Sequence, residues 1–522
     1  MKRLTIKLVL TLVAVVFAVA MSSCSKKDKT ALMKCVPADA YFMTVMDGNK
    51  LWEQCEISIE DDDVTIGKDL EKVLKLNGVD KSKIKEIKEV LRVVNMTEKT
   101  YVVFGYDEEV WFTFFVDDQE EFIKTVEELP HSKAAFDEEK DFMVYDYVAI
   151  KDNQVWICTS QSGEDDIDLK QINKFMDLDK EKCFVGKFET LAEEFSTDDV
   201  TMGMFANLDE IKSAIHSSDV QEFSLVQSIL FDDSKYVVGK ARLTDTQVSV
   251  EIRVLNSKMQ PAKFNLPLAK IDANGMAHID GNAPILAATA IDSKMIDTII
   301  NLMDKNGLLS SSDKTLLESL KQLDGTFALS LTNLNDFAFS QQYVSEDAVK
   351  ENGQVGLNTL ASAFWGTENP FTVSAAGKTL IVRSKDSSAT AGGKVPTALV
   401  GQYIGVFVDF KKADKMIKGV DLSKLGTMYM TIGPDGNGIK FTAVWDINAP
   451  LKSVLQTIEK MKEVNVNNLE FIGLDQWEQM FDNRNSYGYD AYEVDSVAYD
   501  PYYSYYEEPV AVEEVAEDYY GY

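Results

Sequence analysis

One stretch of the sequence decides the fold: residues 405–420, which read GVFVDFKKADKMIKGV. The apolar run of residues 406–408 predicts a buried strand that ends at Asp409. After Asp409, apolar residues recur at i, i+3, i+4 and i+7, the spacing that lines one face of a helix: Ala413, Met416, Ile417 and Val420. The stretch therefore predicts a unit of strand, Asx residue and amphipathic helix, in which the Asx side chain caps the helix.

Looser copies of this unit recur along the chain at irregular intervals, unlike the fixed period of a solenoid or propeller. Their Asx residues are Asp47, Asp117, Asn207, Asp292, Asn333, Asp409 and Asp446. Between the units, turn-forming residues at 152–153, 244–246 and 434–437 separate apolar or alternating runs, which predicts β-hairpins. We expect an α+β fold: antiparallel sheets with helices packed on one face, in two related halves built from the recurring strand-Asx-helix unit.

The composition along the chain predicts five segments. They are a lipoprotein signal peptide at 1–23, a tether at 24–34, an N-terminal α+β half at 35–260, a C-terminal α+β half at 261–483 and a tail at 484–522. Pro261 and Pro267 mark the connection between the halves. The tail repeats tyrosine and acidic residues without a helical or strand period, so we expect it to be disordered.

The N-terminus has the pattern of a secretory signal: basic residues, an apolar run over residues 8–21 that is too short to span a bilayer, and small residues directly before Cys24. This pattern is typical of a bacterial lipoprotein, in which Cys24 becomes the first residue and carries lipid. The alternative is an ordinary secretory signal with an incidental cysteine. Several acyl chains on one residue make a stable anchor, so we expect the mature chain to be held at a membrane.

The formal net charge of −32 makes nucleic acid an improbable partner, because the chain repels phosphate backbones. Only three scattered histidines are present, which disfavours a histidine-based metal site, and we expect no cofactor. The remaining cysteines show no close spacing, so we expect most of them to be buried thiols, with their disulfide state left open: Cys35, Cys55, Cys158 and Cys183.

Motifs that imitate catalytic or binding sites are incomplete. An acidic run at 61–63 begins like a calcium loop but has Ile66 and Lys72 where glycine and glutamate are required. The Gly-Lys-Thr sequence at 377–379 lacks the earlier glycine of a phosphate-binding loop, since Thr372 occupies that position. Two Ser-x-x-Lys matches, at 82–85 and 311–314, lack their companion motifs. We therefore assign no catalytic, cofactor-binding or metal residue.

The tail has the most unusual composition of the chain. Its tyrosines could contact a protein of the envelope or a glycan, because aromatic rings provide contact area at a low entropic cost: Tyr502, Tyr503, Tyr505 and Tyr506. The alternative is a solvated spacer that is rich in tyrosine.

Several segments together resemble a known family. They are the lipoprotein start, the Val-Pro-Ala-Asp-Ala sequence at 36–40 with the strand and helix after it, Leu-Asp-Gly-Thr-Phe-Ala-Leu at 323–329, and the strand at 403–409. Over residues 36–480 the chain resembles the Bacteroidetes lipoproteins with the domain of unknown function DUF4836. This resemblance implies a Gram-negative cell envelope and brings no reaction or catalytic residue.

Our first hypothesis is a membrane-anchored cell-envelope lipoprotein that acts as a non-enzymatic binding or assembly module. The alternative is a surface glycan-capture protein or a carboxylate-dependent hydrolase. The residues after Cys24 are basic rather than acidic, at Lys26, Lys27 and Lys29. In the Gram-negative envelope that the resemblance implies, an acidic run just after the lipidated cysteine tends to mark export to the cell surface. We therefore expect the periplasmic face of the outer membrane rather than the cell surface. A carboxylate-paired cleft lined by aromatic residues would favour the alternative, and a long exposed sheet would favour the first hypothesis.

Overall fold

A computed structural model gives the fold of the chain. It describes residues 30–60, 63–76, 79–94, 100–107, 109–129, 134–160, 167–214, 224, 227–305, 310, 314, 317–318, 320–333, 336–355, 371–385, 392, 394–418, 421–463 and 470–471. The chain falls into two compact units, Met1–Asp475 and Gln476–Tyr522, and the second unit lies outside the described residues. The predicted signal peptide, Cys24 and the predicted tail also lie outside them.

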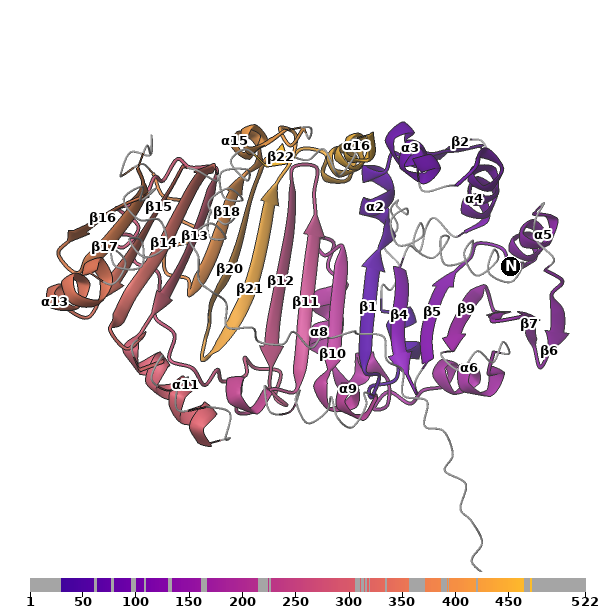
Figure 1. Cartoon of the computed structure of the whole chain (residues 1–522). Helices are drawn as coiled ribbons and strands as arrows, with labels where there is room; N and C mark the ends of the chain where they lie inside the picture. Colours follow the sequence, from indigo (N-terminus) through magenta and orange to yellow (C-terminus); the bar gives the residue numbers. More distant parts are fainter. Residues whose placement is uncertain are drawn as a thin grey trace, which may run out of the picture. The chain divides into compact units, whose positions relative to one another are not determined.

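The described chain mixes helices with one large antiparallel sheet of 18 strands (Figure 1). Its first ten strands are β1 (Phe42–Asp47), β4 (Thr100–Tyr106), β5 (Glu109–Phe115), β6 (Asp137–Glu139), β7 (Phe142–Tyr145), β8 (Val148–Lys151), β9 (Gln154–Ser160), β10 (Met202–Asn207), β11 (Tyr236–Leu243) and β12 (Gln247–Leu255). The other eight are β13 (Ile285–Ile291), β14 (Leu323–Asn333), β15 (Asp336–Tyr343), β16 (Phe371–Ala376), β17 (Thr379–Ser384), β18 (Ile404–Asp409), β20 (Thr427–Asp435) and β21 (Gly438–Asp446). The hairpin of β2 (Ser58–Glu60) and β3 (Asp63–Thr65) and the pair of β19 (Ile417–Lys418) and β22 (Glu470–Phe471) stand apart from it.

The sheet contains two series of seven strands that pair in equivalent order along the chain, and the two series meet at one central pair of strands. Before that pair the order is β9-β5-β4-β1-β10-β11-β12, and after it the order, read from the far end, is β17-β15-β14-β13-β18-β20-β21. The two last strands, β12 and β21, pair antiparallel and make the sheet continuous. The prediction of antiparallel sheet is therefore confirmed, but there is one large sheet rather than separate ones.

Helices cover both faces of the sheet between β1 and β9, so the prediction of helices on one face is wrong for this region. On one face, which we call the first face, Met46 and Tyr101 pack with α3 (Lys68–Leu76), α4 (Lys81–Val93) and α5 (Gln119–Glu128). On the opposite face, the second face, Val45 and Val102 pack with η1 (Leu32–Cys35), α6 (Leu169–Met176), α7 (Phe184–Lys187) and α8 (Glu189–Phe195). Successive side chains of a strand point to opposite faces, and both sets are apolar here, so both faces need cover.

From β13 to β15 the second face is covered by an irregular segment instead of helices. Ile271, Met276 and Ile279 pack there on the small side chains of the sheet. Buried hydroxyl groups of the sheet hold the segment: Thr326 Oγ1 accepts from Asp272 N at 2.8 Å, and Ser340 Oγ donates to Gly275 O at 2.9 Å. These bonds satisfy backbone groups that helices would satisfy internally.

The stretch at 405–420 folds only partly as predicted. β18 ends at Asp409, whose side chain caps α15 (Phe410–Ala413) by accepting from Lys412 N at 3.1 Å. The helix stops at Ala413, continues as the 3-10 turn η3 (Asp414–Met416), and the chain then enters β19. The predicted long amphipathic helix is therefore wrong, because Ile417 pairs as a strand with β22.

The other predicted Asx caps divide into four groups. Asn207 accepts from Asp209 N ahead of α9 (Leu208–Ala214), and Asp292 accepts from Lys294 N ahead of α11 (Ser293–Lys305), as predicted. Asp118 rather than Asp117 caps α5. Asp47 ends β1 and is followed directly by α2 (Gly48–Gln54), the predicted order of elements. For Asn333 and Asp446 the prediction fails: β14 and β15 form an antiparallel pair directly around residues 333–336, and α16 (Pro450–Glu463) starts four residues beyond Asp446.

The folded part of the chain begins before the predicted boundary at residue 35. Leu32 and Met33 have almost no exposed surface and belong to the core of the second face. The predicted tether at 24–34 is therefore too long at its C-terminal end. Cys55, Cys158 and Cys183 are buried free thiols, as expected, and Cys35 is a partly exposed one.

Candidate binding surface

The central strands of the sheet carry polar residues on one face and apolar residues on the other. In β12, Ser249, Glu251 and Arg253 alternate with Val248, Val250 and Ile252. Their cross-strand partners place the polar set on the second face and the apolar set on the first. An antiparallel sheet in water normally turns the polar side outward and the apolar side to a core. For the central strands, we therefore ask which elements pack on the apolar side.

Directly paired residues form three rows across six strands, β12, β21, β20, β18, β13 and β14, on the first face. In that strand order the rows are Val248, Trp445, Met428, Val408, Ile285, Leu331; Val250, Ala443, Met430, Val406, Ala287, Leu329; and Ile252, Phe441, Ile432, Ile404, Thr289, Phe327. We call these residues the apolar face. Thr289 is the one hydroxyl among them, and none is charged.

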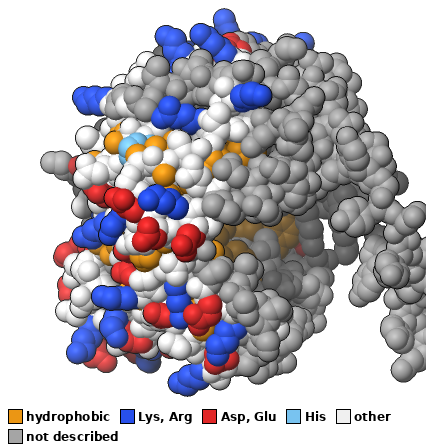
Figure 2. Space-filling model, turned by 60° about the vertical axis from the view of Figure 1, so that its left-hand side comes forward, with side chains coloured by type: hydrophobic (Ala, Val, Ile, Leu, Met, Phe, Trp, Pro, Cys, Tyr) orange, Lys and Arg blue, Asp and Glu red, His pale blue; other side chains and the backbone are white. Residues whose placement is uncertain are grey.

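The apolar face is incompletely buried, and in β13 and β14 this contrasts with the second face of the same strands. In β13, Leu286, Ala288 and Ala290 on the second face are buried, whereas Ile285 and Ala287 on the apolar face remain partly exposed. Ile404 is 43% exposed, a large value for an isoleucine within a strand. Hydrophobic side chains also gather in a hollow of the surface in the view of Figure 2.

Covered regions flank the apolar face at both ends. Beyond β12 and β11, Met202 on β10 packs against the core that α3, α4 and α5 cover. Beyond β14, Phe337 and Phe339 on β15 pack against Val349, at the start of η2 (Val349–Val355), which follows α13 (Glu346–Ala348). Among the described residues, helical segments stand on the sheet at both sides of the apolar face, which forms the floor of a trough between them.

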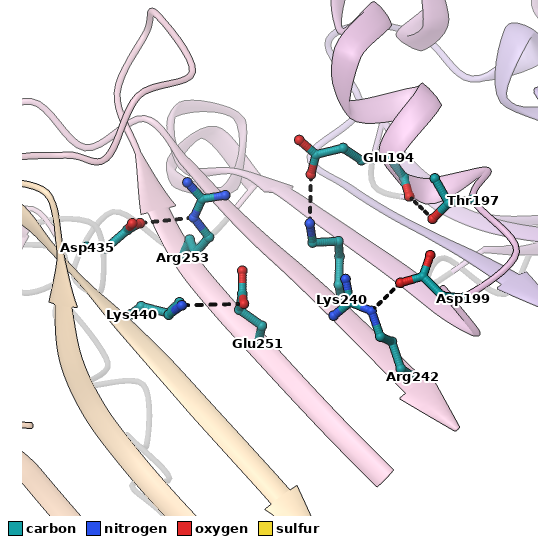
Figure 3. A network of polar contacts seen from close by, with 9 residues as sticks. All are labelled: Glu194, Thr197, Asp199, Lys240, Arg242, Glu251, Arg253, Asp435 and Lys440. Atoms are coloured by element: carbon teal, nitrogen blue, oxygen red, sulfur yellow. Dashed lines mark hydrogen bonds and ion pairs between the residues drawn. The ribbon is translucent and has the colours of Figure 1, made fainter. Parts of the chain in front are cut away.

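The second face of β11, β12 and β21 is a balanced array of charges (Figure 3). Lys240 Nζ lies 2.8 Å from Glu194 Oε2, and Lys440 Nζ lies 3.6 Å from Glu251 Oε2. Arg253 and Asp435 pair at 2.9 Å in a partly buried position. These pairs neutralise one another, so this face suits contact with water rather than with a charged ligand.

A fourth pair lies at the edge of this array. Arg242 Nε donates to Asp199 Oδ2 at 2.6 Å. This hydrogen bond, assisted by the Thr197 side chain, lowers the pKa of Asp199 from 3.8 to about 2. Both side chains are well solvated, which limits what the pair contributes to stability.

A pocket of about 610 Å³ lies where β21 meets α16. Asp446 is the one carboxylate in its lining and accepts from Gln247 Nε2 at 2.7 Å, while Lys424 donates to Gln456 Oε1 at 2.7 Å. Its lining contains no aromatic residue. A carboxylate-dependent glycoside hydrolase needs two carboxylates in a defined geometry, and a glycan site typically offers aromatic faces, so this pocket supports neither.

The residues singled out from the sequence for lipid attachment or partner binding are not among those that the structure describes. They are Cys24 and the tail tyrosines Tyr502, Tyr503, Tyr505 and Tyr506. Trp52, Trp111 and Trp156 are fully buried in the cores and cannot bind a glycan, whereas Trp445 is partly exposed on the apolar face. Among the described residues, no group of three or more His, Cys, Asp or Glu could hold a metal ion.

The apolar face was the site that sequence reasoning missed. Its signal is visible as strict alternation in β12 and as looser alternation in β21, which we interpreted only as evidence for hairpins. Alternation reveals that one side of a strand is apolar but not whether that side is covered. No helix within the described part of the chain has the length and hydrophobicity needed to cross a membrane.

Comparisons with known proteins give no family. No protein-family model matches the chain, and no curated protein matches it. Among solved structures, crystal form I of TP0453 covers 69% of this chain and 93% of its own chain, with 6% sequence identity and a TM-score of 0.26. Crystal form III covers 67% and 92% at 7% identity and a TM-score of 0.26, and form IV covers 42% and 79% at 8% and 0.25. At these values the similarity assigns neither a family nor an activity.

Proposed function

We propose that the chain is a lipid-anchored cell-envelope lipoprotein that works as a non-enzymatic binding module through its apolar face. The observation that carries this proposal is the set of three apolar rows with Ile404 at 43% exposure. Strands about 4.8 Å apart with three alternating residues each give an area of roughly 600 Å². This is the area of the sheet under the three rows, whose residues other than Ile404 are partly buried. An apolar patch of a few hundred Å² on a monomer is often functional.

The anchor and the location are part of the same proposal. Cys24 after an apolar run and small residues supports lipid attachment, and the basic residues behind it support the periplasmic side of the outer membrane. Protease treatment of intact cells tests the location. Protection in intact cells and cleavage after permeabilisation of the outer membrane is the expected result, and cleavage in intact cells would place the protein on the surface.

We also propose that the two halves, predicted at 35–260 and 261–483, are related by duplication of a strand-Asx-helix arrangement. Equivalent backbone hydrogen bonds support this: Asn207 N donates to Tyr41 O, and Asp409 N donates to Pro284 O. Both Asx side chains then cap the next helix. A duplication would give both halves the same order of strands. The segments that pack on the sheet could then diverge between the two halves.

Binding of N-phenyl-1-naphthylamine, an uncharged apolar dye, tests the binding proposal. We expect saturable fluorescence enhancement that Ile404→Lys weakens at least tenfold, because a lysine would bring a charge onto the most exposed residue of the face. Leu76→Lys is the matched control, since Leu76 on α3 is a large apolar residue of similar exposure, 42%, away from the face. Equal dye binding by the two variants would overturn the proposal.

A further inference from the structure

The apolar face offers a ligand no unused hydrogen-bonding side chain. Thr289 is its one hydroxyl, and Thr289 Oγ1 donates to Tyr403 O at 3.2 Å. The indole N–H of Trp445 donates to Leu425 O. Because both groups are satisfied within the chain, a ligand that covers the face meets hydrocarbon surface alone.

A surface that binds a protein partner usually carries polar groups that form hydrogen bonds with that partner. Specific protein interfaces carry about one hydrogen bond per 100–200 Å², which corresponds to roughly three to six for the area of this face. A second copy of the chain would in addition bring another formal charge of −32 against the first. The chemistry of the face and the charge of the chain both disfavour a protein in this position.

A hydrocarbon chain matches the face in charge, polarity and size. The face is uncharged, although charged residues make up 26% of the chain, and a hydrocarbon is uncharged as well. It extends for roughly 20 Å along the strands, and an acyl chain is about 15 Å long, half the thickness of a bilayer core. Met428 and Met430 lie side by side with Val408 and Val406, and flexible thioether side chains adapt to ligands of variable shape.

The walls of the trough favour a single lipid molecule over the surface of a bilayer. α3, α4 and α5 cover the sheet on one side, and η2 stands on it at the other. A helix is about 10 Å in diameter, so a flat membrane resting on these elements would not touch the strands between them. An acyl chain taken out of the membrane can lie on the floor of the trough.

We propose that the apolar face binds the acyl chain of a single lipid molecule. This inference rests on the proposed binding function and names the ligand class of the same surface. The lipid anchor predicted at Cys24 would hold the trough close to a membrane, the source of such molecules. No covalent step is involved.

Quenching of Trp445 by 9,10-dibromostearate tests the inference, because bromine quenches an indole only at short range. The experiment uses the full chain with Cys24→Ser, which cannot carry a lipid of its own. We expect saturable quenching that is absent in Trp445→Phe, at least tenfold weaker in Ile404→Lys and Met430→Lys, and unchanged in Leu76→Lys. Ile404→Ser is a milder second variant in case a lysine disturbs folding, and its affinity should fall between those of wild type and Ile404→Lys.

Four outcomes would overturn the inference. Dye binding without competition by dibromostearate would leave the proposed binding function standing and reject an acyl chain. Binding to dioleoylphosphatidylcholine vesicles without binding to the free acid would show a bilayer contact. A dimer in solution that Ile404→Lys converts to a monomer would show that a second copy occupies the face. Absence of both dye and acid binding would reject the binding function as well.

Discussion

The two halves of the sheet repeat one strand succession but build different cores. Between β1 and β9, large aromatic side chains fill the second face: Phe175 of α6 lies 5.2 Å from Trp111 and 6.0 Å from Trp156, between ring centroids. In the other half, Ala288 on β13, the counterpart of β1, lies between its paired neighbours Ala328 and Gly405. The same backbone arrangement therefore carries either a thick aromatic layer or a thin layer of small side chains.

Side-chain size decides which kind of element can cover each half. Aromatic rings keep the covering helices at a distance, and those helices satisfy their own backbone groups. Small residues let an irregular segment approach closely, and hydroxyl groups of the sheet then bond its backbone, as Ser330 Oγ does with Asp280 N at 3.2 Å. Even one added methyl would disturb this fit, since a Cβ at Gly405 would lie 2.7 Å from Leu399 Cδ2.

The largest effect should come from removing the aromatic centre of the first half. Phe175→Ala deletes a fully buried ring that contacts Phe104, Trp111 and Trp156, so we expect the free energy of unfolding to fall by about 3–5 kcal/mol. Urea denaturation followed by tryptophan fluorescence measures this. A loss below about 1 kcal/mol would show that the aromatic layer is not the main support of this half.

The sequence predicted the strands and hairpins well because their signals are local. The run before Asp409 and the turns at 152–153 and 434–437 each depend on neighbouring residues, and β18, β9 and β21 follow them closely. The helix predicted after Ala413 failed because Ile417 pairs with Phe471, far along the chain. Likewise, Asn333 looked like a helix cap but lies at a hairpin, since Asn333 pairs with Asp336.

The candidate site depended on information that no local pattern contains. The alternation of Val248, Val250 and Ile252 indicates an apolar side, and this much could be predicted. Whether a helix covers that side is decided by segments between distant strands. The first half places α3 and α4 between β1 and β4, whereas the apolar face lies beyond their reach. Exposure at Ile404 is therefore a property of the assembled sheet.

The second prediction compares the two faces of one strand in the second half. Leu286 and Ile285 are neighbours in β13, but Leu286 is fully buried in the second-face core and Ile285 belongs to the partly exposed apolar face. We expect Leu286→Ala to lower the free energy of unfolding by about 2–4 kcal/mol and Ile285→Ala by about 1 kcal/mol. The loss is smaller at Ile285 because truncating a partly exposed side chain removes less buried apolar surface. Urea midpoints of the two variants measure the difference.

This pair of variants also tests whether the apolar face is partly exposed, as the binding proposal requires. Equal losses would mean that Ile285 is as well covered as Leu286 and that the two faces do not differ. A smaller loss for Ile285→Ala that increases when dibromostearate is present would sharpen the contrast, since a bound acyl chain would bury Ile285. Leu286→Ala should show no such ligand dependence of its loss.

The smallest effect concerns the array of charges on the second face of β11, β12 and β21, which lies between the two cores of that face. Arg242 lowers the pKa of Asp199 to about 2, below the value near 3.9 of an unfolded chain. A lowered pKa in the folded state stabilises the fold above about pH 4, and this contribution is lost as the pH falls toward 2. Since both groups are solvated, the contribution is about 0.5 kcal/mol at neutral pH.

Asp199→Asn should therefore lower the free energy of unfolding by about 0.5 kcal/mol at pH 7 and by about half of that at pH 3. Urea titrations of wild type and variant at the two pH values measure the change, and Asp198→Asn is the neighbouring control. A difference that stays constant between pH 7 and pH 3 would mean that the side chain acts through packing rather than charge. In that case balanced ion pairs would not explain why the second face of β11, β12 and β21 suits contact with water.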